Sequence, residues 1–269
     1  MKNYGIELVI MKSKIKLLIT GCMGRMGKQL IKTSNKDKNV KLVALTESKP
    51  INKKISGIVP ELNTEKALSK ADVIIDFTIP KCTFEVLKIA SKLKKKVVIG
   101  TTGFSKKEEN MIKKFSNKTA ILKAGNMSLG INLLMYLTEI ASKSLGNNFL
   151  SKVFETHHKF KKDAPSGTAE RLLEIIKESR KLSQKDISHG RSGMVGERQE
   201  SEIGSHALRG GDVVGEHTVM FAGTGERIEL THRATDRVIF AAGALKAASW
   251  VQYQEPGLYS MQDVLGLTC

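Results

Sequence analysis

Short apolar runs alternate with amphipathic stretches through the first half of the chain. Strands are predicted where β-branched residues cluster, at residues 14–20, 40–46, 71–78, 95–102 and 119–125. Helices are predicted between them, near residues 25–34, 64–69, 81–93 and 105–116. Strand, helix and strand at this spacing are typical of a parallel sheet with right-handed crossovers. The first half is therefore expected to form an α/β domain with a Rossmann-like, doubly wound parallel sheet.

The pattern changes after about residue 150. A long apolar helix is predicted at 127–146, and the stretches 151–160, 194–211, 212–223 and 226–235 resemble antiparallel strands joined by glycine-rich turns. One helix is predicted among them at 167–180, and a helix rich in small residues follows at 236–254. We expect an α+β domain with a mostly antiparallel or mixed sheet over residues 129–237, and a first domain over 1–128 that segment 238–269 completes.

Composition narrows the class of protein. The hydrophobic fraction of 41% and the charged fraction of 26% are those of a soluble globular protein. Three widely spaced cysteines without a CxxC pattern favour neither a disulfide framework nor a metal site, and a cytoplasmic location is expected. No apolar stretch approaches the roughly 18 residues of a membrane helix, so no membrane partner is expected. Met11 is a possible alternative start.

The net charge of +17 is unevenly distributed. Residues 1–128 hold 27 of the 44 Lys and Arg residues but only 10 of the 27 Asp and Glu residues, whereas residues 129–269 are balanced. Such asymmetry is one sign of a nucleic-acid binder. However, 35 of the basic residues are lysines, they are scattered, and aromatic residues make up only 5% of the chain. Lysine-rich solvated surfaces are the favoured interpretation, and no nucleic-acid partner is expected.

A glycine-rich turn lies between the first predicted strand and the first predicted helix, in "ITGCMGRMGKQLI" (19–31). Gly21, Gly24 and Gly27 allow backbone N–H groups to approach a pyrophosphate at the helix N-terminus. Glu47 follows 20 residues after Gly27, at the end of the second strand, where an acid accepts hydrogen bonds from a ribose. Together these features predict dinucleotide binding by this domain.

Polar and glycine residues also follow three later strands, in "DFTIP" (76–80), "GTTGF" (100–104) and "AGNMS" (124–128). The carboxyl ends of parallel strands share one edge of a sheet, and open α/β sheets bind ligands there. We therefore expect a nicotinamide cleft at this edge, and NADH or NADPH as the cofactor. The predicted cofactor-binding residues are Gly21, Cys22, Met23, Gly24, Arg25, Met26, Glu47, Phe77, Thr78, Gly100, Thr101, Thr102, Ala124, Gly125, Asn126 and Met127.

A cationic cluster precedes the helix at 167–180, in "ETHHKFKKDAPSGTA" (155–169). In an extended segment His157, Lys159 and Lys161 would face one way, with His158 facing the other unless the backbone bends. The small residues Ser166, Gly167 and Thr168 at the helix start expose N–H donors that attract a carboxylate or phosphate. A solvated charged loop is the simpler alternative. The pattern otherwise indicates a site for a small dianion beside a histidine acid.

The motif HHxxKxDAPSGTA in this stretch resembles the signature of the 4-hydroxy-tetrahydrodipicolinate (dihydrodipicolinate) reductase family. The blocks "GCMGRMGKQL", "VVIGTTGF", "GNMSLGIN", "GDVVGEHTVMF" and "ERIELTHRATDR" are similar to that family in the same order. The resemblance implies NAD(P)H-dependent reduction of 4-hydroxy-tetrahydrodipicolinate to tetrahydrodipicolinate in diaminopimelate and lysine biosynthesis, with hydride transfer to ring C4. It also implies a homotetramer that associates through the sheet of the second domain, which binds the substrate.

The resemblance also implies roles for particular residues. His157 would protonate or polarise the small dicarboxylate substrate, and Lys161 would stabilise developing charge. His158, Ser166, Gly167 and Thr168 would bind the substrate carboxylates. Many family members have an arginine after the ribose acid, whereas here Ser48 follows Glu47. Because Glu47 repels a 2′-phosphate while Lys49, Lys53 and Lys54 attract one, dual cofactor use with a lean to NADH is expected.

Two other functions fit parts of the sequence. The first is a Rossmann reductase acting on another small carboxylated imine or aldehyde. The second is a redox-sensing nucleic-acid binder, which only the basic first half favours. Arg209 is assigned mainly a structural role, and His206, His217 and His232 are expected to be hydrogen-bonded core or surface histidines rather than ligands.

Overall fold

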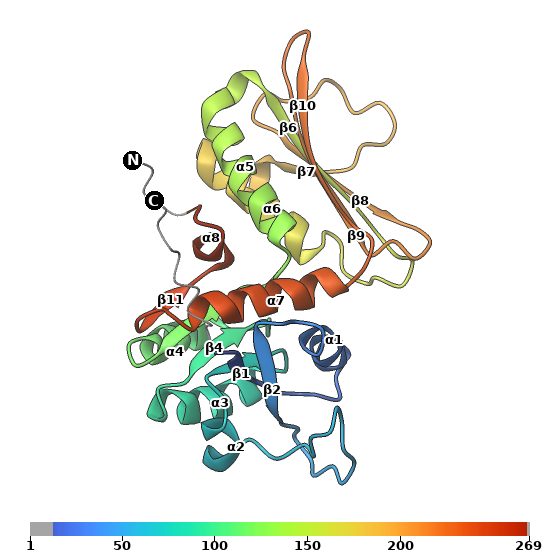
Figure 1. The fold of residues 1–269 in the computed structure, drawn as a ribbon. Helices are drawn as coiled ribbons and strands as arrows, with labels where there is room; N and C mark the ends of the chain where they lie inside the picture. The colour runs from blue at the N-terminus through green and yellow to red at the C-terminus, as the bar shows by residue number, and fades with distance from the viewer. Residues whose placement is uncertain (1–12, 268–269) are drawn as a thin grey trace, which may run out of the picture. The chain divides into compact units, whose positions relative to one another are not determined.

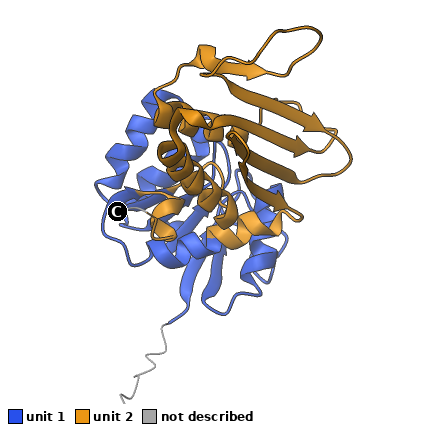
Figure 2. Cartoon of the chain, turned by 90° about the horizontal axis from the view of Figure 1, so that it is seen from above, with its two compact units in different colours: residues 1–122, 245–258 blue, residues 123–244, 259–269 orange. Residues whose placement is uncertain are grey.

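The computed structural model describes residues 13–267, so the alternative start at Met11 and the cysteine at position 269 lie outside them. The chain divides into two compact units (Figure 2). Unit 1 runs as far as Leu122 and includes Leu245–Leu258, and unit 2 holds Lys123–Ala244 and the residues from Tyr259 onward. Among the described residues, no helix is long and apolar enough to cross a bilayer.

Unit 1 is built on a six-stranded sheet with the order β11-β5-β4-β3-β1-β2 (Figure 1). Its strands are β1 (Ile15–Ile19), β2 (Val40–Leu45), β3 (Val73–Asp76), β4 (Lys96–Ile99), β5 (Ala120–Lys123) and β11 (Gly257–Tyr259). β1 pairs parallel with both β2 and β3, and β3 pairs parallel with β4. The five predicted strands of the Rossmann-like sheet are confirmed, each shorter than expected, while β11 was not predicted.

Four helices of unit 1 connect these strands. They are α1 (Arg25–Ser34), α2 (Glu65–Ser69), α3 (Pro80–Lys92) and α4 (Lys106–Ser116). Local sequence explains three of their starts: Thr64 caps α2, proline opens α3, and Ser105 with Glu108 forms a capping box at α4. α1 begins differently, because its N-cap is Gly24, which offers no side chain to its first N–H groups.

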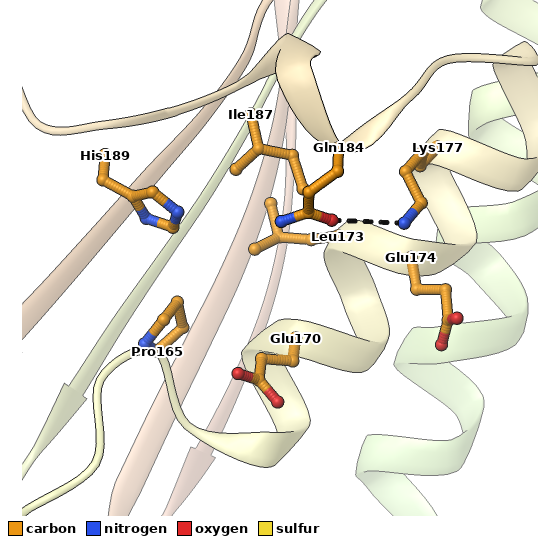
Figure 3. A pocket seen from close by; sticks show the side chains of 8 residues that line it. All are labelled: Pro165, Glu170, Leu173, Glu174, Lys177, Gln184, Ile187 and His189. Carbon is orange, nitrogen blue, oxygen red and sulfur yellow. Dashed lines mark hydrogen bonds between the residues drawn. The ribbon is translucent and has the colours of Figure 1, made fainter.

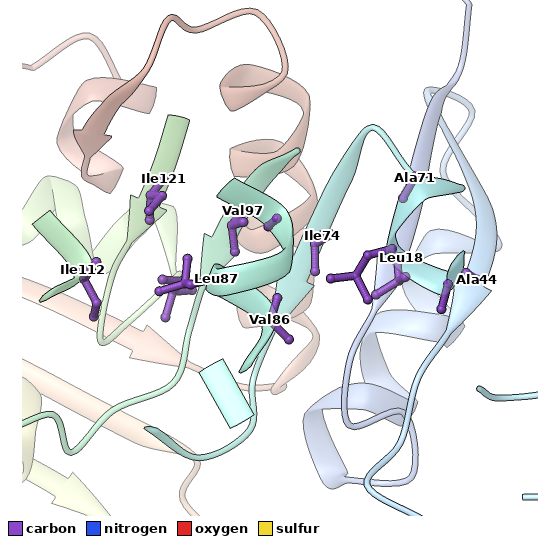
Figure 4. Packing of buried hydrophobic residues seen from close by; sticks show 13 residues of the cluster. Leu18, Ala44, Ala71, Ile74, Val86, Leu87, Val97, Ile112 and Ile121 are labelled. Carbon is purple, nitrogen blue, oxygen red and sulfur yellow. The ribbon is translucent and has the colours of Figure 1, made fainter. Parts of the chain in front are cut away.

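The central strands of unit 1 are buried, which explains why they read as continuous apolar runs rather than as alternating ones. Figure 4 shows Leu18, Ile74 and Val97 from β1, β3 and β4 packing together with Val86 and Leu87 of α3. All five side chains are 0% exposed. This rigid sheet fixes the loops that follow its carboxyl ends.

Unit 2 contains a five-stranded sheet with the order β10-β9-β6-β8-β7. Its strands are β6 (Leu150–His157), β7 (Ile187–His189), β8 (Ile203–Arg209), β9 (Gly215–Ala222) and β10 (Arg227–Ala234). β6 pairs antiparallel with β9 but parallel with β8, and β7 is also parallel to β8. The mixed sheet is confirmed, but the antiparallel reading of the stretch 194–211 is wrong. Helix α6 (Gly167–Arg180) lies in the connection from β6 to β8, and such a crossover returns the chain in the same direction.

The predicted apolar segments form α5 (Leu129–Leu145) and α7 (Val238–Val251). Helix α8 (Met261–Val264) and the short 3₁₀ turns η1 (Gly146–Asn148) and η2 (Gln184–Asp186) were not predicted. Within unit 2, Ile131 and Leu134 of α5 and Leu172 of α6 pack with Val153 and Phe221 of the sheet. This core supports the carboxyl end of β6 and the start of α6.

Gly27 provides a test of the close packing between α1 and the turn after β1. A Cβ atom at this position would lie 2.8 Å from Cys22 Cα and nearer still to the Gly21 carbonyl oxygen. We expect Gly27→Ala to lower the free energy of unfolding, measured by urea denaturation, by at least about 2 kcal/mol because backbone must move. The matched control is Lys28→Ala, an exposed position on the same helix, and a loss for Gly27→Ala no greater than the control's would contradict the packing.

Candidate functional site

The turn after β1 presents backbone N–H groups at the start of α1. Gly21 has φ +58°, which favours glycine, and a Cβ atom there would lie 2.7 Å from Thr78 Cγ2. The N-cap Gly24 makes no side-chain capping bond, and the first turn of α1 carries no acidic residue. An uncapped helix start behind a glycine turn fits the pyrophosphate of a dinucleotide.

The other predicted residues of this turn differ in what they offer a ligand. The Cys22 side chain is fully buried, and burial, with the nearby Glu47 charge, raises the pKa of its thiol to about 11. Only the backbone of Cys22 is therefore placed to meet a cofactor. Met23 and Arg25 have exposed side chains, and that of Met26 is half-buried.

Glu47 lies two residues beyond β2 and touches the glycine turn. One carboxylate oxygen accepts a 3.1 Å hydrogen bond from the Met23 N–H. The other accepts bonds from the Ser48 N–H at 2.9 Å and the Ser48 hydroxyl at 3.2 Å. These bonds hold a negative charge beside the glycine turn, where the ribose acid was predicted.

The predicted residues at the ends of β3 and β4 lie together. The Phe77 ring occupies the space that a side chain at Gly100 would need. The Thr78 N–H donates a 2.8 Å hydrogen bond to the hydroxyl of Thr101, which is buried, whereas Thr102 is exposed. Both strand ends therefore form one connected structure within unit 1.

The segment Ala124–Met127 belongs to unit 2, where Asn126 lies beside a residue predicted to bind the substrate. The Asn126 side-chain amide donates a 3.2 Å hydrogen bond to the Thr168 hydroxyl. The Asn126 side-chain oxygen accepts a bond from the Ser128 N–H at 2.9 Å. Gly243 of α7 packs so closely on the Met127 carbonyl that a side chain there would collide with it. The structure therefore brings a predicted cofactor residue and a predicted substrate residue into contact.

His157 is the last residue of β6 and is nearly buried. Its Nδ1 contacts Oε2 of Glu155, which lies two residues earlier on the same face of the strand. The His157 and His217 rings meet edge-on with centroids 5.1 Å apart. A Cβ atom at Gly215 would lie 3.0 Å from His157 Nε2. The absence of a side chain at this position on β9 therefore makes room for the imidazole.

Glu155 is 2% exposed and accepts hydrogen bonds from several parts of unit 2. Besides His157, its donors are Arg209 Nη2 and the Ser166 N–H, each 3.0 Å from Oε1. Burial raises the pKa of Glu155, but hydrogen bonds from these three donors outweigh it and lower the pKa to about 2. Glu155 is therefore an anion that fixes Nδ1 of His157 as the donor and leaves Nε2 available to a ligand.

The chain turns immediately after His157, so the expected alternation of His157, Lys159 and Lys161 on one face is wrong. The Lys161 N–H donates to the His158 carbonyl at 3.1 Å, and the Lys159 side chain is exposed. Lys161 Nζ reaches both oxygens of Asp163, at 2.8 and 2.9 Å, and this hydrogen bond lowers the pKa of Asp163. The turn therefore keeps Lys161 close to the end of β6, and the Lys161 ammonium group is bound by the exposed Asp163.

The start of α6 follows this turn. The buried Ser166 is its N-cap: the Oγ atom accepts from the Ala169 N–H at 3.2 Å and lies 3.1 Å from His217 Nε2. Gly167 is exposed at the first helical position. His158 is half-buried, and its buried Nδ1 has no hydrogen-bond partner among the described residues. An anion can therefore approach the N–H groups of α6 at Gly167 and Thr168, whereas the Ser166 side chain is already engaged.

The surroundings of His157 also contain side chains of the types that bind metal ions. Ligand-type atoms of Glu155, His157 and His217 lie within 4.8 Å of one another. The His157 imidazole lies against one carboxylate oxygen of Glu155, and the Arg209 cation lies against the other. A charge-paired carboxylate and imidazole describe this arrangement better than a metal centre, and the prediction of no metal stays a prediction.

A separate pocket of about 290 Å³ lies between α6 and β7 (Figure 3). Its lining includes Pro165, Glu170, Glu174 and His189, and Lys177 donates to Gln184 at its rim. Neither His157 nor Lys161 lines it. The pocket therefore shares only the Pro165 neighbourhood with the predicted site.

No functional role was predicted from sequence for three residues of the network around His157, namely Glu155, Arg209 and His217. Glu155 carried a detectable signal, because a residue two positions before a strand histidine shares its face. Arg209 and His217 could not be found in this way, since they come from strands β8 and β9. His217 is hydrogen-bonded and buried, as expected, and Arg209 binds both Glu155 and the Asp163 carbonyl oxygen.

Acidification should weaken unit 2 through His217. Burial, together with the neighbouring His157, lowers the pKa of His217 from 6.5 to about 4. Between these values the unfolded chain binds a proton that the folded chain does not, so the free energy of unfolding falls as pH drops from about 6.5 to 4. We expect His217→Gln to reduce this fall by up to about 3 kcal/mol, measured by denaturant titrations at pH 7 and pH 4. The exposed His189→Gln serves as the control, and equal pH dependence in both variants would contradict the assignment.

Comparison with known proteins identifies the family. Residues 15–127 match the family model described as "Dihydrodipicolinate reductase, N-terminus" and residues 130–265 match "Dihydrodipicolinate reductase, C-terminus". The chain is 56% identical over 257 residues to the 4-hydroxy-tetrahydrodipicolinate reductase of Pelagibacter ubique, covering 94% of this chain and 98% of that protein. The enzyme of the same name from Aquifex aeolicus is 46% identical over 273 residues, covering 94% and 99%.

A solved structure shares the fold. The dipicolinate-bound dihydrodipicolinate reductase from Paenisporosarcina sp. TG-14 has a TM-score of 0.77 and 25% identity, covering 93% of this chain and 98% of that one. The family models match both halves of the sequence, and the fold of this solved reductase matches 93% of the chain. The chain belongs to the dihydrodipicolinate reductase family.

Proposed function

We propose that this protein is an NAD(P)H-dependent oxidoreductase that reduces 4-hydroxy-tetrahydrodipicolinate to tetrahydrodipicolinate in diaminopimelate and lysine biosynthesis. The observation that carries this function is the match to one reductase family over both halves of the chain. The dipicolinate-bound relative supports a small dicarboxylate as substrate. We therefore prefer this function to the two alternatives from the sequence, a reductase of a different imine or aldehyde and a nucleic-acid binder.

Unit 1 would hold the cofactor through the features that fit a dinucleotide. The uncapped N-terminus of α1 supports pyrophosphate binding, and Glu47 supports recognition of the adenosine ribose. When bound, the reduced nicotinamide would supply the hydride for ring C4 of the substrate, and the C4 hydroxyl would leave with a proton as water. The chain's own contribution is to orient the nucleotide and to supply the polar groups at the ends of β3 and β4.

In unit 2, His157 would act as the acid or polarising group. Its Nδ1 lies against the anionic Glu155, which orients the imidazole. Nε2 is then the nitrogen that can donate to the substrate. Glu155 is thus tied to the reaction through orientation of His157 rather than through contact with the substrate.

The carboxylates of the substrate would lie near the start of α6. The N–H groups at Gly167 and Thr168 form a site for an anion, and the macrodipole of α6 favours negative charge there. The Lys161 ammonium, now paired with the largely exposed Asp163, could exchange that partner for a substrate carboxylate or developing ring charge. His158, whose Nδ1 has no hydrogen-bond partner within residues 13–267, would complete the anion site.

Substitution of the two proposed catalytic groups tests this mechanism. His157→Gln and Lys161→Ala should each lower kcat by about two orders of magnitude or more, because acid–base and electrostatic groups contribute on this scale. Turnover is followed at 340 nm (the reduced nicotinamide band) with substrate formed in situ from pyruvate and aspartate semialdehyde. Lys162→Ala, which changes an exposed neighbouring lysine, should retain activity. Full activity of both His157→Gln and Lys161→Ala would rule out the proposed roles.

The cofactor preference is proposed to be dual, with a lean to NADH. Glu47 places a carboxylate beside the glycine turn and repels a 2′-phosphate, whereas Lys49, Lys53 and Lys54 are exposed on the following segment and would attract one. The charges therefore oppose each other.

Neutralising the Glu47 carboxylate should shift this balance. We expect Glu47→Gln to raise the ratio of kcat/KM for NADPH over NADH by about tenfold, equivalent to about 1.4 kcal/mol of relieved repulsion. Glu65→Gln, which removes an exposed carboxylate paired with Lys92, should leave the ratio unchanged. A hundredfold preference of the unmodified protein for NADPH would overturn the lean to NADH.

We also propose that the protein acts in the cytoplasm as a homotetramer associated through unit 2. The exposed apolar side chain of Leu208 on β8 supports an interface on this sheet. Leu208 pairs with Thr156, so it lies on the face of the sheet opposite to His157.

A further inference from the structure

Asp76, the last residue of β3, is a fully buried carboxylate surrounded by threonine hydroxyls. Its Oδ1 lies 2.5 Å from Thr20 Oγ1 and 2.7 Å from Thr78 Oγ1. Its Oδ2 lies 2.5 Å from Thr83 Oγ1 and 3.0 Å from Thr101 Oγ1. Each oxygen thus has two hydroxyl neighbours, which is the full acceptor capacity of a carboxylate.

This arrangement fixes the direction of the hydroxyl protons. A carboxylate can only accept hydrogen bonds, and each hydroxyl has one proton to donate. Thr20, Thr78 and Thr83 also lie 3.3 to 3.5 Å from backbone carbonyl oxygens, but their contacts with Asp76 are shorter. The protons therefore point toward Asp76, in charge-assisted bonds that offset the cost of burying the carboxylate. The lone pairs of each hydroxyl are left on the side away from Asp76.

Two of these threonines, Thr78 and Thr101, lie in the predicted cofactor loops. Thr101 Oγ1 accepts the Thr78 N–H at 2.8 Å, which joins the ends of β3 and β4. Thr78 in turn packs its methyl group against Gly21 of the glycine turn. Through Thr78 and Thr101, Asp76 is connected to the loops after β1, β3 and β4 without reaching the surface itself.

The strand order indicates which half of the cofactor these loops meet. Glu47 follows β2, the glycine turn follows β1, and β3 and β4 come next in the sheet. With the ribose acid at β2 and the pyrophosphate at β1, the next positions along the edge correspond to the nicotinamide half. On this order, Asp76 and its threonine neighbours would lie under the nicotinamide half of a bound cofactor rather than under the adenosine half.

We propose that Asp76 is a positioning residue for the nicotinamide half of the cofactor. It holds Thr78 and Thr101 in one arrangement and orients the Thr78 hydroxyl as an acceptor for hydrogen-bond donors, the class that includes a carboxamide NH₂ and ribose hydroxyls. This inference rests on the proposed NAD(P)H-dependent function and adds to it a residue that touches neither cofactor nor substrate.

The test compares two ligands that differ in the nicotinamide half. NADH carries that half, whereas ADP-ribose ends at the pyrophosphate-linked ribose. In Asp76→Asn the amide NH₂ must donate, so the hydroxyls on that side reverse their protons while the shape is preserved. We expect the Kd for NADH, measured by calorimetry, to rise at least tenfold, and the Kd for ADP-ribose to change by less than about threefold.

A matched control separates positioning from simple loss of stability. Thr83 donates to the same carboxylate oxygen as Thr101, but it lies on α3 rather than on a strand-end loop. Thr83→Val should lower the melting temperature while leaving the ratio of the two Kd values unchanged. Equal weakening of both ligands in Asp76→Asn, or no weakening of either, would overturn the inference. Failure of the unmodified protein to bind either NADH or NADPH would instead overturn the proposed function.

A second pair of variants keeps the test decisive if Asp76→Asn does not fold. Thr101→Val removes the hydroxyl but keeps the shape, and Thr101→Ser keeps the hydroxyl. The valine variant should lose NADH affinity at least tenfold relative to ADP-ribose, and the serine variant should restore it. If serine and valine behave alike, hydroxyl orientation has no role and the inference fails.

Discussion

A buried carboxylate stays charged only where enough hydrogen-bond donors surround it, and both units of this protein are organised around such a group. In unit 2, Glu155 is bound by an imidazole, a guanidinium and a backbone N–H, which come from β6, β8 and the start of α6. In unit 1, Asp76 is bound by four hydroxyls. Removing the donors of either carboxylate would leave an unpaired charge in the core.

The two carboxylates differ in what their donors do. Two partners of Glu155 are basic side chains, His157 and Arg209, and the network therefore fixes the orientation of the His157 imidazole. The partners of Asp76 are neutral, and the network controls hydrogen-bond direction instead. A reductase of a charged substrate needs both functions, because the substrate must meet a proton donor while the nucleotide is held in one orientation.

Local pattern was sufficient for most of unit 1 because alternating strands and helices are encoded in short stretches. The contact between Glu47 and the glycine turn agrees with a spacing rule that reflects the regular geometry of a βαβ unit. In unit 2 the decisive contacts are non-local. The parallel pairing of β6 with β8 depends on the crossover through α6, and the partners of Glu155 lie up to 54 residues away in sequence. The turn after His157 was not predicted, because the alternation of side chains between the two faces of the strand was assumed to continue beyond the end of β6.

The position of β6 in the middle of its sheet has a consequence for biosynthesis. β6 emerges from the ribosome first among the strands of unit 2, but its two neighbours, β8 and β9, are completed only near residues 209 and 222. A strand whose pairing partners are distant in sequence is incorporated into its sheet late. The entropy cost of loop closure must be met before the hydrogen bonds and side-chain contacts of strand pairing can form. The imidazole pair of His157 and His217 therefore assembles after most of the chain has been translated, so a prematurely terminated product would contain the signature motif without its chemistry.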